Sequence, residues 1–164
     1  MVNVIIAQVT DRLELSTHSP AQTQQIGNRL GQLLQPGDVI CLAGELGAGK
    51  TTLVVGIGHG WGALEAVNSP TFVFVNEYSN AGGGRLYHVD AYRLRDAADA
   101  ESIGLPEMLN DTAGTLLIEW PERALACLPP ERLWIELTWT GEETRALRIE
   151  ASGERYRQLI KMMG

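Results

Sequence analysis

One glycine-rich segment constrains the fold of this chain more than any other feature of its sequence. The residues Gly44-Glu-Leu-Gly-Ala-Gly-Lys-Thr51 match every fixed position of the phosphate-loop pattern G-x-x-x-x-G-K-S/T. An apolar run at 38–43 precedes the segment, as expected of a strand buried on both faces, and Thr51–Val55 can open a helix. Strand, glycine loop and helix in this order predict an α/β domain with a phosphate-binding loop.

The residue types of this loop suit a polyphosphate and a divalent metal ion. Glycines at 44, 47 and 49 permit a tight turn whose N–H groups face inward, and the helix N-terminus adds a partial positive charge. Lys50 is one of only two lysines in the chain and would bring a full charge to the β- and γ-phosphates. The Thr51 hydroxyl is a hard oxygen ligand suited to magnesium.

Length, charge and cysteine content narrow the class of protein. The 164 residues predict a single domain over 1–164. We expect a cytoplasmic protein, because the chain shows neither a membrane-span-length apolar stretch nor a basic signal-peptide region. The two cysteines have no spacing typical of a zinc site or a disulfide framework. A net charge of −7 without a Lys/Arg run disfavours direct, tight binding to nucleic acid.

The rest of the chain predicts a mixed β-sheet flanked by helices, with antiparallel hairpins. Ser19 and Pro20 signal the start of a helix that ends before Pro36. The phosphate-loop helix ends near 58–60. Further strands are predicted within 3–17 and at 72–75, 85–90, 115–118, 131–140 and 144–151, with hairpin loops at 80–84 and around Gly141. Further helices are predicted at 96–103, 105–109 and 153–163.

Two acidic residues end predicted strands. Glu119 follows the apolar strand 115–118, which is where phosphate-loop proteins place a carboxylate that holds magnesium. Asp90 ends the strand 85–90 and shares one face with His88, because strand side chains alternate with a period of two. A histidine and an aspartate on one face suit either metal binding or an ordinary buried hydrogen bond, and the spacing alone leaves both open.

Two further features lie near these candidates. Asn68–Phe72 is a polar, proline-stiffened segment after the phosphate-loop helix, where nucleotide-sensing switch segments usually lie. Its Thr71 is placed to reach magnesium or the γ-phosphate, although composition alone favours a plain turn. Trp120, next to Glu119, suits either shielding of the site or simple packing, and packing is favoured.

Four motifs together resemble the TsaE family in order and spacing. They are Gly-Glu-Leu-Gly-Ala-Gly-Lys-Thr-Thr at 44–52, Asn-Ser-Pro-Thr-Phe at 68–72, His-Val-Asp-Ala-Tyr-Arg-Leu at 88–94 and Ile-Glu-Trp-Pro-Glu-Arg at 118–123. TsaE is the small ATPase of bacterial threonylcarbamoyl-adenosine synthesis on tRNA. The resemblance spans roughly residues 15–150, and the later motifs are more specific than a phosphate loop.

The resemblance implies ATP and Mg²⁺ as cofactors and a set of site residues. The ATP phosphates would bind the loop residues Gly44, Glu45, Leu46, Gly47, Ala48, Gly49, Lys50, Thr51 and Thr52. Thr51 and Glu119 would hold the metal, and Asp90 would be an essential acid near the γ-phosphate, acting with Glu119 and Lys50. Thr71 would be the switch contact, Arg145 would reach the nucleotide from the C-terminal hairpin, and the adenine would lie near 19–23.

The resemblance also implies partners, and rival functions stay open. The family works with TsaB and TsaD, so tRNA would be reached only indirectly through that complex. A small-molecule kinase is the main alternative, because such enzymes use the same kind of phosphate loop. A GTPase is disfavoured because the chain has no N-K-x-D motif. A nucleotide-gated adaptor with negligible hydrolysis of its own is the third possibility.

Overall fold

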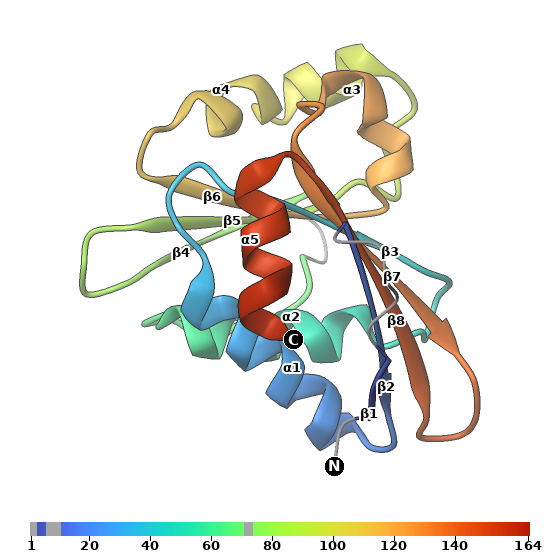
Figure 1. The fold of residues 1–164 in the computed structure, drawn as a ribbon. Helices are drawn as coiled ribbons and strands as arrows, with labels where there is room; N and C mark the ends of the chain where they lie inside the picture. The colour runs from blue at the N-terminus through green and yellow to red at the C-terminus, as the bar shows by residue number, and fades with distance from the viewer. Residues whose placement is uncertain (1–2, 6–10, 71–73) are drawn as a thin grey trace.

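The computed structural model describes residues 3–5, 11–70 and 74–164, and its strands form one mixed sheet flanked by helices (Figure 1). Eight strands within these ranges follow the order β1-β2-β8-β7-β3-β6-β5-β4. The strands are β1 (Asn3–Ile5), β2 (Arg12–Thr17), β3 (Val39–Ala43), β4 (Val75–Ser79), β5 (Arg85–Asp90), β6 (Gly114–Glu119), β7 (Arg132–Trp139) and β8 (Arg145–Ser152). The helices are α1 (Pro20–Leu33), α2 (Lys50–Trp61), α3 (Ala97–Ser102), α4 (Leu105–Asn110), the 3₁₀ helix η1 (Pro121–Cys127) and α5 (Glu154–Met163).

The centre of the sheet is parallel and its outer strands are antiparallel, which confirms the predicted mixed sheet. β3 pairs in parallel with β6 on one side and with β7 on the other, and β5 pairs in parallel with β6. Every residue of β3 and β6 is buried, so β3 appears in the sequence as a continuous apolar run and β6 contains the apolar residues 116–118. The β4–β5 and β7–β8 pairs are the two predicted hairpins. The carboxyl ends of β3, β5 and β6 meet at one edge of the sheet.

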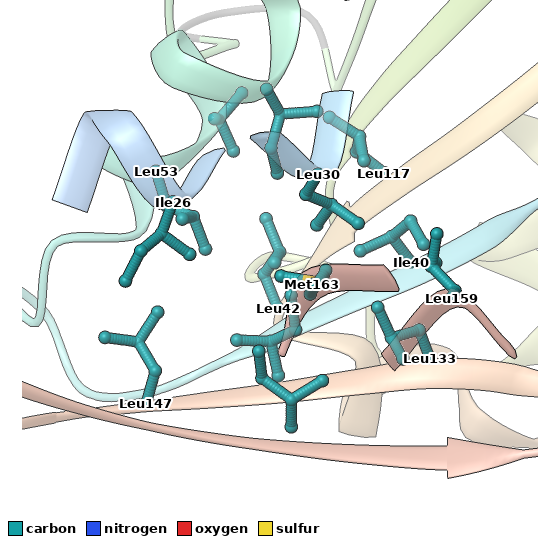
Figure 2. Packing of buried hydrophobic residues seen from close by; sticks show 14 of the residues in the cluster. Ile26, Leu30, Ile40, Leu42, Leu53, Leu117, Leu133, Leu147, Leu159 and Met163 are labelled. Atoms are coloured by element: carbon teal, nitrogen blue, oxygen red, sulfur yellow. The ribbon is translucent and has the colours of Figure 1, made fainter. Parts of the chain in front are cut away.

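Alternating strand side chains build a hydrophobic core on each face of the sheet. Ile40 and Leu42 of β3 pack with apolar residues of α1, α2 and α5 (Figure 2). Val39 and Cys41 point to the other face and pack with residues of α3, α4 and η1. Burial raises the pKa of the Cys41 thiol to about 12, as expected of an unreactive core cysteine.

None of the described helices is long and apolar enough to cross a membrane.

Glycines bring α1 and α2 into close contact. A Cβ at Gly31 of α1 would lie 2.7 Å from the backbone nitrogen of Trp61, and one at Gly56 of α2 would lie 2.9 Å from the Cα of Gln24. Gly27 and Gly60 make similar close approaches to the facing helix. Larger side chains at these positions would push the helices apart and displace α2, whose first turn directly follows the glycine loop.

An ion pair anchors α5 to the residue that precedes β3. The Arg155 guanidinium donates to the Asp38 carboxylate at 2.7 Å from Nη2 and 3.0 Å from Nε. Asp38 is only 4% exposed, and its carboxylate also accepts from the backbone N–H of Gln35 at 2.7 Å. Because a buried carboxylate is costly without partners, this contact holds α5 against the start of the central strand.

Only part of the predicted strand at 72–75 can be compared with the structure, because residues 72 and 73 lie outside the described residues. Phe74 precedes β4, which begins at Val75 and continues to Ser79, where it pairs with Arg85 across the hairpin. β4 is an edge strand, so polar residues such as Asn76 are tolerated in it and conceal it in the sequence. The predicted switch residue Thr71 lies outside the described residues.

Candidate nucleotide-binding site

The glycine loop joins β3 to α2 as predicted, and its glycines are needed for its conformation. Gly44, Gly47 and Gly49 have φ angles of 143°, 80° and 101°, a region that side chains rarely adopt. A Cβ at Gly44 would also lie 2.6 Å from the carbonyl oxygen of Leu137. Gly49 is the N-cap of α2, so the free N–H groups of the first helical turn open directly onto the loop.

Lys50 is folded back onto the loop and is nearly buried. Its Nζ donates to the carbonyl oxygens of Gly44 and, at 3.1 Å, of Glu45. The same ammonium lies 4.3 Å from the ring centre of Trp120, a cation–π contact. Burial lowers the pKa of Lys50, and nearby carboxylates, first that of Glu119, oppose this effect. The lysine is therefore a desolvated cation whose local acceptors include two carbonyl groups.

Trp120 lies at the pocket, in the position that would shield it, which the sequence left open beside simple packing. It borders the pocket beside Lys50, and its ring lies 4.9 Å from that of Tyr92. Its φ of 56° places it in the left-handed region, which is uncommon for a residue with a bulky side chain. This backbone conformation ends β6 abruptly and turns the indole toward the glycine loop.

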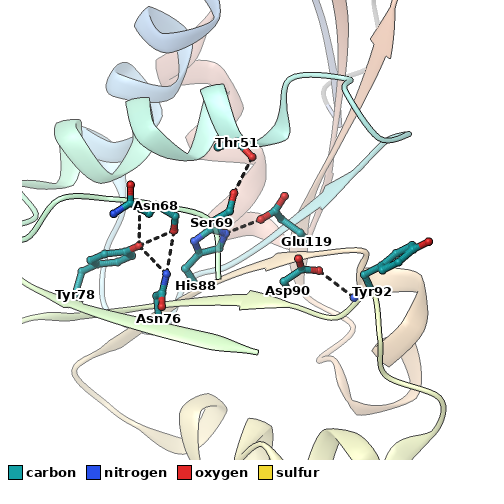
Figure 3. A network of polar contacts seen from close by, with 9 residues as sticks. All are labelled: Thr51, Asn68, Ser69, Asn76, Tyr78, His88, Asp90, Tyr92 and Glu119. Atoms are coloured by element: carbon teal, nitrogen blue, oxygen red, sulfur yellow. Dashed lines mark hydrogen bonds and ion pairs between the residues drawn. The ribbon is translucent and has the colours of Figure 1, made fainter. Parts of the chain in front are cut away.

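Thr51 is linked to the segment after α2. Its Oγ1 lies 2.9 Å from the hydroxyl oxygen of Ser69 (Figure 3). The neighbouring Asn68 is held by Tyr78, whose hydroxyl donates to the Asn68 carbonyl at 2.9 Å and accepts from its N–H at 3.0 Å. The sequence indicated this segment through Thr71, which lies outside the described residues, and the contact of Ser69 with Thr51 was not predicted. The signal available in the sequence was the hydroxyl group of Ser69 itself, within a polar segment that was already singled out.

The two predicted acids lie side by side at the carboxyl ends of β5 and β6. Asp90 pairs in register with Glu119, and its Oδ1 accepts from the backbone N–H of Tyr92 at 3.0 Å. Glu119 is 5% exposed, and its Oε2 lies 2.7 Å from Nε2 of His88 (Figure 3). Of the two possibilities that the sequence left open for His88, the structure shows the buried hydrogen bond, and its partner is Glu119.

Arg145, at the start of β8, packs against the glycine loop. Its Nε donates to the carbonyl of Ala48 at 3.0 Å and its Nη2 to that of Gly47 at 3.4 Å. Its Nη1 also donates to carbonyls of the β7–β8 hairpin, including that of Thr144 at 2.9 Å. These contacts tie the loop to the hairpin and leave the guanidinium at the edge of the pocket.

The predicted residues converge on one pocket of about 340 Å³. It is lined by Leu46, Gly47, Gly49, Lys50, Thr51, Thr52, Ser69, Asp90, Glu119, Trp120 and Arg145. Of the other predicted loop residues, Ala48 is buried in the core, and Gly44 and Glu45 present their carbonyls to Lys50. A larger hollow of about 600 Å³ between α1 and α2 contains neither the glycine loop nor either acid of the site, so it is not the candidate site.

The donor set in the pocket fits a nucleotide with magnesium. Thr51 and Glu119 bring a hydroxyl and a carboxylate oxygen to the same pocket as a buried cation and a helix N-terminus. Within the described ranges, no three His, Cys, Asp or Glu side chains are grouped as a metal site. Mg²⁺ commonly takes one or two protein oxygens and completes its shell with phosphate and water, so this arrangement suits it.

A glycine loop between a parallel strand and a helix, with a lysine and a threonine opening that helix, defines the fold class of phosphate-loop proteins. A family model described as "Threonylcarbamoyl adenosine biosynthesis protein TsaE" matches residues 17–147. The chain belongs to the TsaE family.

Individual relatives agree with this family assignment. A Bacillus subtilis (strain 168) protein named tRNA threonylcarbamoyladenosine biosynthesis protein TsaE is 40% identical over 150 residues, which is 92% of each chain. A protein of the same name from Streptomyces coelicolor is 40% identical over 139 residues, covering 81% of this chain and 93% of the relative. The crystal structure of Bacillus subtilis YdiB matches with a TM-score of 0.77 at 32% identity, covering 96% of this chain and 97% of that one.

Proposed function

We propose that this chain binds ATP with Mg²⁺ in the pocket beside the glycine loop and hydrolyses it. The observation that carries the proposal is the convergence of Lys50, Thr51, Asp90 and Glu119, which come from three separate segments, on one pocket. A loop with three glycines of positive φ at a helix N-terminus offers backbone N–H groups to phosphate. Bound Mg²⁺ would supply positive charge that stabilises the transferring phosphoryl group.

Each residue has a distinct task in this proposal. Lys50 neutralises phosphate charge, exchanging its carbonyl acceptors for phosphate oxygens. Thr51 and Glu119 are the protein ligands of the metal. Asp90, held at the strand end by its bond from the Tyr92 N–H, orients the attacking water or the shell of the metal. Arg145 holds the glycine loop by donating to the carbonyl of Ala48, and it borders the pocket that the nucleotide would occupy.

We further propose that the chain serves threonylcarbamoyl-adenosine synthesis on tRNA through the partner proteins TsaB and TsaD. The support is the family itself, whose named relatives are tRNA threonylcarbamoyladenosine biosynthesis proteins. The net charge of −7 opposes direct approach to a polyanion, so the partners would contact the tRNA. ATP binding and hydrolysis would then act by changing how this chain contacts those partners.

The kinase alternative requires an arginine-bearing lid over an acceptor pocket. The region suggested for such a lid contains α3 and α4, of six residues each. Ala100 and Leu105 in these helices are fully buried in the core on the face of the sheet that contains Cys41. Because opening a lid there would expose that core, the packing weighs against a kinase.

The proposal is tested by ATP turnover of the chain alone and with TsaB and TsaD. We expect slow hydrolysis alone, a changed rate with the partners, and weak tRNA binding in gel shifts at physiological salt. An unchanged rate and no complex formation would refute the partner-based function and leave ATP binding standing. Rapid phosphate transfer to a small metabolite by the isolated chain would favour the kinase instead.

A further inference from the structure

His88 is a fully buried polar residue for which packing alone gives no reason. It lies on β5 in parallel register with Leu117 of β6, and Glu119 follows two residues later on the same face. The His88 Nε2 and the Glu119 Oε2 are 2.7 Å apart, and both side chains are shielded from solvent, with exposures of 0% and 7% (Figure 3). His88 itself does not line the nucleotide pocket, whereas Glu119 does.

The hydrogen-bond network assigns the proton on the imidazole ring. The Nδ1 of His88 is buried and has no hydrogen-bond partner among the described residues. A proton on Nδ1 alone would face the Nε2 lone pair toward a carboxylate oxygen and would leave a buried N–H without a partner among the described residues. The proton therefore belongs on Nε2, which donates to Oε2 of Glu119.

We propose that His88 is a positioning residue that sets the orientation of the Glu119 carboxylate toward the metal. This inference rests on the proposed nucleotide–metal site. A carboxylate bound at one oxygen by a rigid neighbour cannot rotate freely, so its other oxygen keeps a defined direction. Partners of this kind typically change metal affinity about 10- to 100-fold when they are removed. Since His88 does not border the pocket, replacing it should change the affinity for the metal and leave the affinity for the nucleotide alone unchanged.

A matched pair of variants isolates the N–H group. His88→Gln keeps a donor nitrogen at about the same distance from the backbone, and His88→Met has a similar length and volume without a donor. The probe is Mn²⁺, titrated into each protein with ADP bound and protein in excess, with free Mn²⁺ followed by electron paramagnetic resonance. ADP affinity in EDTA and the thermal midpoint are measured for the same proteins.

We expect His88→Met to weaken Mn²⁺ binding about tenfold or more, with ADP affinity in EDTA unchanged. His88→Gln is expected to stay within about threefold of the wild type on the same scale. Wild-type Mn²⁺ affinity in His88→Met, or an equal loss in both variants, would overturn the positioning role. If His88→Met does not fold, His88→Asn is used in its place. The side-chain amide of asparagine is too short to reach Glu119, so we expect the same loss of Mn²⁺ affinity.

Failure of the underlying site has a different signature. If the wild-type protein binds no ADP, the proposed function falls and this inference falls with it. If the wild type binds ADP and Mn²⁺ together and His88→Met does so equally well, only the positioning role is overturned.

Discussion

Replacing Lys50 by methionine would remove one positive charge from the glycine loop and keep the apolar stem of the side chain. In the structure, the Lys50 ammonium bonds to the carbonyls of Gly44 and Glu45 and lies 4.3 Å from the ring centre of Trp120. This places the cation on the floor of the pocket, next to the first turn of α2. Lys50→Met is therefore expected to weaken ATP binding while the loop keeps its conformation.

The size of this effect follows from the contact that is lost. A hydrogen bond that involves a charged group contributes about 1.5–3 kcal/mol, which corresponds to about a ten- to hundredfold loss of ATP affinity. The thermal midpoint of unfolding, in contrast, should not fall. Burial lowers the pKa of Lys50, so the charged form is less favourable in the folded chain than in the unfolded one. Below that pKa, removing the charge should leave the thermal midpoint unchanged or raise it.

Isothermal titration calorimetry with ATP and Mg²⁺ measures the affinity, and differential scanning calorimetry measures the midpoint. The chain offers a matched control, because its other lysine, Lys161, is exposed on α5 away from the pocket. Lys161→Ala should bind ATP as the wild type does. Unchanged affinity in Lys50→Met, or equal losses in the two lysine variants, would refute the placement of the phosphates at this loop.

Three further predictions follow from named contacts. Asp90→Asn and Glu119→Gln should each slow ATP hydrolysis by about 100-fold or more with little change in circular dichroism, and normal turnover in both would contradict their catalytic role. Gly31→Ala should lower the free energy of unfolding by about 1–3 kcal/mol in urea titrations, because a methyl group would overlap the backbone of α2. An unchanged urea midpoint would argue against the close approach of the helices. Arg155→Ala should lower the free energy of unfolding by about 3 kcal/mol, since it strands a buried carboxylate. Arg157→Ala, in an exposed ion pair on the same helix, should cost less than about 1 kcal/mol, and similar losses in both arginine variants would contradict the assignment.

Features encoded in contiguous residues were predictable from the sequence. The glycine loop, the buried strand before it and the helix after it depend on local backbone geometry and on an apolar run, and all three are found in the structure. The start of α1 was also predictable, because the hydroxyl of Ser19 accepts from the N–H of Gln22 within the same turn. The edge strand β4 was not, because its polar residues become a strand only by pairing with β5.

The sequence by itself determined the residue types of the candidate site and the strand ends on which the two acids lie. Tertiary structure decided which of these residues touch. The bonds of Glu119 to His88 and of Thr51 to Ser69 join residues 31 and 18 positions apart, and each depends on strand register or on the path of a loop. Likewise, Trp120 reaches Lys50 only because the chain turns sharply after β6. Such contacts depend on packing between distant elements, which no local pattern records.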